Sequence, residues 1–158
     1  MAELCADNGP ARLGDADKVK ALVAARADLA ATEPLEGRAA VHQAAIGGHA
    51  EVLRILARAR ADLGARDVRR LCAVHLAADA GQVDVLRFLR SADPHLLDAP
   101  DGAGKSAVHR AAQRGRIDVL ETLEELGVDL FAEAPSGKTA AHFAAEAGQS
   151  KVLEFLPP

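Results

Sequence analysis

The sequence has no tryptophan and no tyrosine, and only two cysteines among its 158 residues. Tryptophan and tyrosine, with arginine, most often anchor protein interfaces, so any anchor here must come from arginine or from other apolar side chains. Cys5 and Cys72 lie far apart and fit neither a disulfide framework nor the paired cysteine spacing of a zinc site. We therefore expect two reduced thiols, with Cys72 packed in the interior.

The sequence also lacks a long apolar run and a strong excess of either charge. No stretch is apolar over the length of a bilayer, and Met1-Ala2-Glu3 does not begin a basic and then apolar secretory signal. A net charge of −4 disfavours binding to nucleic acid or to an anionic membrane, although a local basic patch is compatible with it. With 49% apolar residues, we expect one domain over residues 1–158, cytoplasmic or nuclear.

One short segment, His-x-Ala-Ala, occurs four times. The copies begin at His42, His75, His109 and His142, so that they are 33, 34 and 33 residues apart. Each histidine is followed six residues later by a glycine and then by an apolar run, and a fifth, weaker run covers residues 17–22. Four copies in phase indicate a structural repeat.

The repeated unit predicts two short helices. The first is rich in alanine and barely two turns long, which is too short to be stable in isolation, so packing must hold it. The glycine after it supplies the left-handed residue that ends a helix. The second helix buries the apolar run, and because no unit covers its own apolar face, stability comes from stacking.

With these features the sequence resembles the ankyrin-repeat family, whose unit is a β-turn and two short antiparallel helices. The resemblance covers nearly the whole chain and implies an all-α solenoid of stacked helix-turn-helix units. We expect a degenerate N-terminal repeat followed by four full repeats, at 1–33, 34–66, 67–100, 101–133 and 134–158.

The repeats depart from the family pattern at helix starts and at turns. The family begins its first helix with Thr-Pro-Leu-His, whereas no copy here keeps the proline and only Ser106 and Thr139 keep the capping hydroxyl. The turn glycine of the other repeats is replaced by Arg70, so we expect that turn to have a different shape. In the N-terminal repeat, Asn8-Gly9-Pro10 should interrupt the first helix.

Two segments, 99–106 and 132–139, match the loosest form of a phosphate-binding loop, in which Gly-Lys-Ser/Thr follows a small residue and four others. A working loop needs a buried strand before it, so that backbone amides and a helix N-terminus converge on the phosphates. No such strand is predicted, and we interpret these segments as turns and helix caps, with Lys105 and Lys138 facing solvent. A nucleotide-binding enzyme stays a remote alternative.

The histidines and Cys72 also permit a chemical interpretation. Packed helices lie roughly 8–10 Å apart, whereas ligands of one zinc ion lie about 2 Å from it, so the repeated histidines cannot share a metal. We expect them to be buried and hydrogen-bonded to the adjoining turn, with His49 and His95 exposed. Cys72 and His75 are close enough on one helix to touch, but Cys72 occupies the capping position. We therefore predict no catalytic residue, metal or cofactor.

The resemblance implies that turns and first helices line a concave face that is free to bind a partner. We expect a non-enzymatic scaffold for protein–protein interaction; an inhibitor or regulatory subunit of an enzyme is the alternative. Arginines should form a basic stripe that favours an acidic partner, with Leu76 and Phe143 as apolar anchors, although Arg110 could instead pair with Asp79 or Glu146. The candidate residues are Arg38, Gln43, Ile46, Arg69, Arg70, Leu76, Asp79, Lys105, Arg110, Gln113, Arg114, Lys138, Phe143 and Glu146.

The last apolar run, in residues 151–156, repeats the pattern of an internal unit but has no further unit to cover it. A solenoid needs a polar terminal face for solubility. We expect this end to fray, to associate end to end with a second copy through its helix, or to be followed by more protein.

Overall fold

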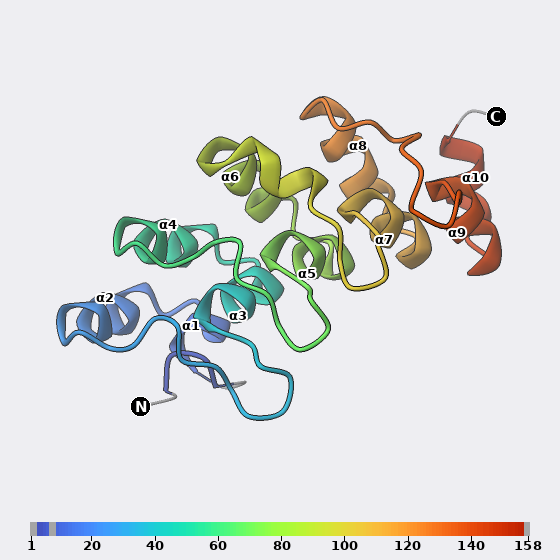
Figure 1. The fold of residues 1–158 in the computed structure, drawn as a ribbon. Coiled ribbons are helices and arrows are strands. Elements are labelled where there is room, and N and C mark those ends of the chain that lie inside the picture. Colours follow the sequence, from blue (N-terminus) through green and yellow to red (C-terminus); the bar gives the residue numbers. More distant parts are fainter. Residues whose placement is uncertain (1–2, 7–8, 157–158) are drawn as a thin grey trace.

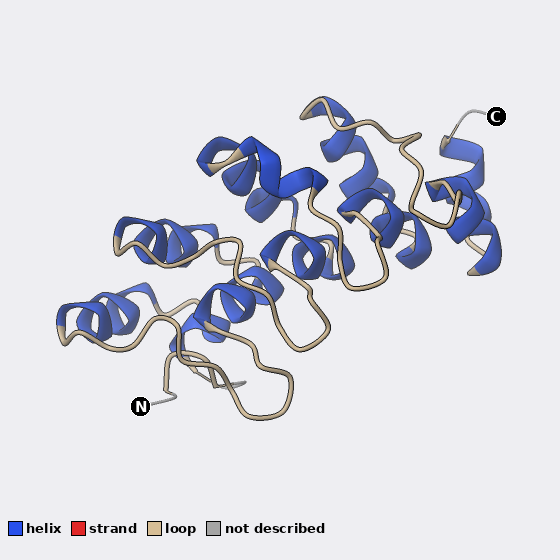
Figure 2. Ribbon diagram, in the orientation of Figure 1, coloured by secondary structure: helices blue, strands red, loops and turns tan. Residues whose placement is uncertain are grey.

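A computed structural model describes residues 3–6 and 9–156. Within these ranges the chain forms ten α-helices and one 3₁₀ helix, and the only β structure is an isolated bridge between Thr32 and Ala39. Odd-numbered helices stack on one another in one layer and even-numbered helices in a second layer, which gives an elongated molecule with the termini at opposite ends (Figure 1). Loops between successive pairs extend beyond the odd-numbered layer (Figure 2).

The first helix of each pair lies in the odd-numbered layer, which consists of α1 (Pro10–Leu13), α3 (Ala40–Gly47), α5 (Ala73–Ala80), α7 (Ala107–Arg114) and α9 (Ala140–Glu146). The even-numbered layer consists of α2 (Ala16–Ala24), α4 (Ala50–Arg58), α6 (Val83–Ala92), α8 (Ile117–Glu125) and α10 (Ser150–Phe155), with the 3₁₀ helix η1 (Pro94–Asp98) after α6. This is the all-α solenoid that the repeat predicts.

Alanine allows the odd-numbered helices to stack closely. Ala44, Ala77 and Ala111 occupy equivalent positions on α3, α5 and α7, and all three are fully buried. Larger apolar side chains of the second helices, such as Leu53 and Leu86, fill the space between the layers. Because each buried face is completed by the next pair, the core is continuous along the stack.

A glycine follows most helices of the odd-numbered layer, here called the inner helices. The neighbouring repeat packs directly against such a glycine after α3. Gly48 has a left-handed backbone with φ of 80° after α3, and a Cβ atom there would lie 2.3 Å from Oε1 of Gln82. The Gln82 amide donates a hydrogen bond to the carbonyl of Ile46 at 3.0 Å. Glycine is therefore required here both by backbone conformation and by the approach of the next repeat.

The N-terminal repeat differs from the prediction. Pro10 begins α1 instead of interrupting it, because proline at the first position of a helix loses no intrahelical hydrogen bond. Asn8, the other residue of the predicted interruption, lies outside the described residues. His49 is half-buried rather than exposed, since its Nε2 forms a hydrogen bond with the Arg12 carbonyl at 3.0 Å and so joins α1 to the next repeat. His95 is exposed, as expected.

The turn that carries Arg70 keeps the shape of its neighbours, so the prediction of a different shape was wrong. Arg70 has a φ of 59°, in the same left-handed region as Gly104 in the next turn. The Asp67 amide donates to the Leu71 carbonyl at 2.9 Å, and the Asp67 side chain accepts from the amides of Arg69 and Leu71, each at 2.8 Å. These bonds hold the turn in the same shape although Arg70 is not a glycine.

Three of the repeated histidines bind the loop that leads from their own repeat into the next. In all four, Nδ1 accepts a hydrogen bond from the amide of the residue that precedes its helix, so Nε2 carries the proton. The Nε2 atoms of His42, His75 and His109 each lie 2.9 Å from a carbonyl oxygen of the following loop. These three are buried, as predicted, but His142 is exposed because no further helix pair of the described chain packs over it.

Candidate functional site

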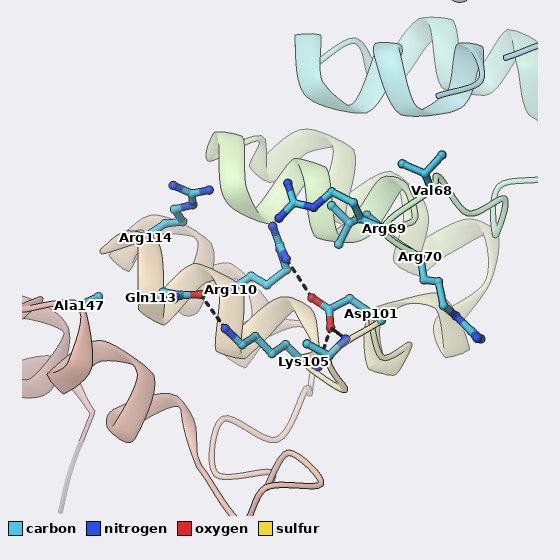
Figure 3. A pocket seen from close by; sticks show the side chains of 12 residues that line it. Val68, Arg69, Arg70, Asp101, Lys105, Arg110, Gln113, Arg114 and Ala147 are labelled. Atoms are coloured by element: carbon cyan, nitrogen blue, oxygen red, sulfur yellow. Dashed lines mark hydrogen bonds and ion pairs between the residues drawn. The ribbon is translucent and has the colours of Figure 1, made fainter. Parts of the chain in front are cut away.

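Two consecutive turns, 67–71 and 101–105, and the helix α7 enclose a groove of about 770 Å³ (Figure 3). Repeat stacking creates it, because each turn lies beside the next while α7 forms its floor. The side chains that line it are mostly polar or charged, among them Arg69, Arg70, Asp101, Lys105, Arg110 and Arg114.

A buried ion network lies at the base of the groove. The Asp101 side chain is 4% exposed, and its Oδ2 accepts a hydrogen bond from Nη1 of Arg110 at 2.9 Å. Its Oδ1 accepts from the amides of Ala103 and Lys105 at 2.8 and 2.9 Å. Burial acts to raise the pKa of Asp101, but these amides and the Arg110 guanidinium together hold it below its ordinary value.

Arg110 is committed to this network. Its other guanidinium nitrogens, Nε and Nη2, bind both carboxylate oxygens of Asp79, with Nε at 3.1 Å from Oδ1. The pairing with Asp79 was one of the alternatives that the sequence left open; Glu146 pairs with Lys138 instead. Arg110 thus neutralises acidic groups of two repeats and is not available to a partner.

The charges around the groove do not balance. Five cationic side chains line it, and only the carboxylates of Asp101 and Asp79 form ion pairs with them among the described residues, so these cations outnumber their paired carboxylates by three. Arg69 and Arg70 are exposed and form no ion pair with any residue that the structure describes, whereas Arg114 lies 3.6 Å from Asp79. In Figure 3, Arg69 extends toward Arg110, and Arg70 extends to the opposite side of the turn.

Lys105 is held against the groove wall instead of facing solvent. It is half-buried, its Nζ donates to Oε1 of Gln113 at 3.0 Å, and the same atom lies 4.4 Å from the centroid of the Phe143 ring. At this distance an ammonium group is attracted to the face of an aromatic ring. Lys138 is likewise half-buried and occupied by Glu146.

Two known protein families match parts of this chain. Residues 10–98 match a family described as ankyrin repeats (3 copies), and residues 74–124 match one described as ankyrin repeats (many copies). The chain belongs to the ankyrin-repeat family. A search of curated proteins gave no match. Ankyrin repeats generally mediate protein–protein interaction and are typically non-enzymatic modules, so the turns and inner helices are the natural candidates for an interface.

Four of the predicted interface residues expose little surface in this ankyrin domain, although Arg110 borders the groove and Leu76 borders a second hollow. Gln43, Leu76, Arg110 and Phe143 are all buried, which corrects their assignment as partner contacts. The helices of the odd-numbered layer lie so close together that these side chains are covered by a neighbouring repeat. Phe143, for example, packs edge to face against His109, with ring centroids 5.3 Å apart. Leu76 and Phe143 therefore cannot be the principal anchors.

Five of the remaining candidates line the main groove, namely Arg69, Arg70, Lys105, Gln113 and Arg114. Ile46 and Asp79 line a second, smaller hollow of about 470 Å³ together with Arg38, Leu76 and Arg114. Arg38 lies between turns, where it pairs with Glu36 and has its Nε 3.8 Å from Oδ2 of Asp67.

Sequence reasoning missed three residues of this surface. Asp101 completes the ion network, Val68 lines the main groove and Arg116 lines the hollow. The signal for Asp101 was present, because aspartate at the first position of a turn commonly accepts backbone hydrogen bonds within it. No sequence signal marks Val68, since an apolar residue on a turn is ordinarily assigned to the core.

The Cys72–His75 pair is structural. The Cys72 sulfur lies 3.0 Å from Nδ1 of His75, and both residues are buried. Burial raises the pKa of the Cys72 thiol and lowers the pKa of His75, so the pair stays a neutral thiol and a neutral imidazole. The thiol donates to the ring and takes the place of the hydroxyl of Ser106 in the next repeat, whose Oγ lies 2.9 Å from its own histidine.

The Gly-Lys segments are turns, as the repeat predicts. In the first, the amides of Ala103 and Lys105 are directed at the carboxylate of Asp101, which occupies the donors that a phosphate group would require. No strand precedes either segment in the described ranges. The nucleotide-binding interpretation therefore has no structural support.

The C-terminal pair is better covered than its sequence predicts. Val152 and Leu156 are buried, because α10 packs against α8 and α9. Leu153 is 40% exposed and Phe155 half-buried, so only part of the apolar face is open. Pro157 and Pro158 lie outside the described residues. Among the described residues, no helix has the length and apolar character needed to cross a membrane.

Proposed function

We propose that this ankyrin domain binds a partner protein with an acidic surface, and that the binding surface is the groove between turns 67–71 and 101–105. The observation that carries the proposal is the charge excess there. Arg110 pairs with the buried Asp101 and the half-buried Asp79, while the exposed Arg69 and Arg114 retain capacity for external acceptors. Guanidinium groups bind carboxylates through paired hydrogen bonds, so an acidic side chain is the expected ligand.

The lining of the groove supports a macromolecular partner over a small ligand. Small-molecule sites are mostly apolar cavities with a few polar groups, whereas charged side chains dominate here. An acidic protein would be steered toward the positive groove, so the association rate should fall as salt rises. We place this binding in the cytoplasm or nucleus, where cysteine thiols such as that of Cys72 stay reduced. End-to-end association through α10 stays a prediction.

Partner capture with matched variants tests the proposal. The wild-type chain, Arg69→Ala/Arg114→Ala and the control Arg58→Ala/Lys151→Ala are immobilised, and proteins retained from a source lysate are quantified by mass spectrometry. The control removes the same charge from exposed positions on α4 and α10.

We expect an acidic protein that is retained by wild type and control, lost from the groove variant, and released by moderate salt. Equal retention by all three chains would overturn the proposal. Adding the purified chain to the partner, if that partner is an enzyme, then shows whether binding inhibits it.

A further inference from the structure

Two neighbouring turns carry large apolar side chains at their tips. Leu35 is 85% exposed and Val68 is 67% exposed. The two turns are joined by a hydrogen bond from the Val68 amide to the Glu36 carbonyl at 3.0 Å. The Val68 side chain also lies against Gly37. Leu35 and Val68 therefore belong to one ledge, which we call the apolar ledge.

The apolar ledge is continuous with the cationic groove. Val68 lines the groove, and Arg69 follows it directly in the same turn. Isolated exposed apolar residues are common on protein surfaces, and Leu13 and Phe131 are examples elsewhere in this chain. The ledge differs from these because it adjoins a surface of unbalanced charge, so that one partner segment can contact both.

We propose that the partner presents a short extended segment with one large apolar side chain, which sits on the apolar ledge, and carboxylates about three residues away, which bind Arg69 and Arg114. The proposal rests on the function proposed above and adds the chemistry of the recognised sequence. Leu35 and Arg69 belong to successive repeats, and so do Val68 and Arg114. Stacked helices lie roughly 8–10 Å apart and an extended chain advances about 3.3 Å per residue, so the distance of one repeat corresponds to about three residues.

The two halves of the site make separable contributions. The cationic groove acts over distance and governs the association rate and its salt dependence. The apolar ledge acts only on contact, so its removal should speed dissociation and leave the salt dependence unchanged.

Selection from a displayed library of random 12-residue peptides tests this inference on the full chain. We expect enrichment of peptides with one large apolar residue about three positions from two or more aspartates or glutamates. A synthetic peptide of the enriched sequence is then measured by fluorescence anisotropy against three variants over a range of salt.

Leu35→Ser/Val68→Thr should weaken binding about 10-fold at every salt concentration, the loss expected for two partly buried apolar contacts. Arg69→Ala/Arg114→Ala should weaken binding at low salt and flatten the salt dependence. Leu13→Ser/Phe131→Ser, which removes two exposed apolar residues outside the ledge, should change neither.

The outcomes separate the two proposals. Enriched acidic peptides without an apolar preference, unaffected by Leu35→Ser/Val68→Thr, would overturn the apolar ledge and leave the acidic-partner function standing. A selection that enriches no acidic peptide would contradict the function itself.

Discussion

Arg70 holds a left-handed backbone conformation at a turn where the adjacent repeats use glycine. Its φ is 59°, against 76° for Gly104 and 74° for Gly137. A side chain in this region costs about 1 kcal/mol, because Cβ crowds the backbone. The hydrogen bonds of Asp67 keep the turn in place and leave that cost unrelieved.

A pair of glycine exchanges measures this cost. Arg70→Gly should raise the free energy of unfolding by about 0.5 kcal/mol, since relief of strain exceeds the added entropy of the unfolded chain. Gly137→Ala should lower it by about 1 kcal/mol, and because a Cβ there meets no atom within 4 Å, the backbone conformation alone is responsible. Urea denaturation gives both values. A destabilised Arg70→Gly would mean that its side chain contributes more than its backbone costs.

Arg110 is the residue on which the base of the groove depends. Arg110→Met should lower the free energy of unfolding by about 3 kcal/mol, because it leaves the buried Asp101 without its charged partner. Arg114→Met, on the same helix but with a side chain 60% exposed, should change it by less than about 0.5 kcal/mol. Equal effects in thermal denaturation would show that the buried network contributes nothing specific.

The sequence predicted the residues that repeat and not those that act in pairs. The histidines and glycines recur at fixed spacing, so their roles followed from the period. The burial of Leu76 and Phe143 depends on how closely the neighbouring helices approach, which the spacing in the sequence does not reveal. The commitment of Arg110 to Asp101 and Asp79 likewise depends on contacts between repeats.

At the scale of elements, His42, His75 and His109 connect the start of their helix to the loop that leads into the following repeat. Nδ1 fixes the start of the helix, and Nε2 donates to a carbonyl of the next loop. Burial lowers the pKa of His42, His75 and His109, because the charged imidazolium loses hydration in the interior. The folded stack therefore favours the neutral form of these three histidines.

Stability should consequently fall as the solution becomes acidic. With folded pKa values below the ordinary value of about 6.5, the unfolded chain binds more protons, so the stabilisation is complete above pH 6.5 and is lost as pH falls toward the folded pKa values. The urea midpoint should be lower at pH 5.5 than at pH 7.5. A midpoint that is constant or higher at pH 5.5 would contradict buried, neutral histidines.

The element pattern was largely predictable, with exceptions at the turns. The helix pairs followed from alanine-rich segments, glycine caps and apolar runs. Two features did not follow from the sequence, the start of α1 at Pro10 and the regular shape of turn 67–71. Proline is tolerated at Pro10 because it stands at the first position of the helix, and the non-glycine Arg70 is tolerated because hydrogen bonds to Asp67 hold its turn. Such compensation is visible only in three dimensions.

At the scale of the whole molecule, charge is separated in space. The chain carries a net charge of −4, yet one groove in the middle of the stack has a positive excess. The acidic remainder of the surface would repel an acidic partner elsewhere and so direct it to the groove. Glu121 and Glu124 are exposed on α8, in the even-numbered layer, and do not line the groove.

Titration of the ¹⁵N-labelled chain with a glutamate-rich peptide, followed by amide chemical shifts, shows directly whether the groove is the surface that binds acidic ligands. The chain, at 16.4 kDa, is small enough for every described repeat to be observed. We expect saturable shifts confined to turns 67–71 and 101–105 and to α7, which disappear in high salt and in Arg69→Ala/Arg114→Ala. Shifts centred on α4, α6 or α8, or none at low salt, would contradict this expectation.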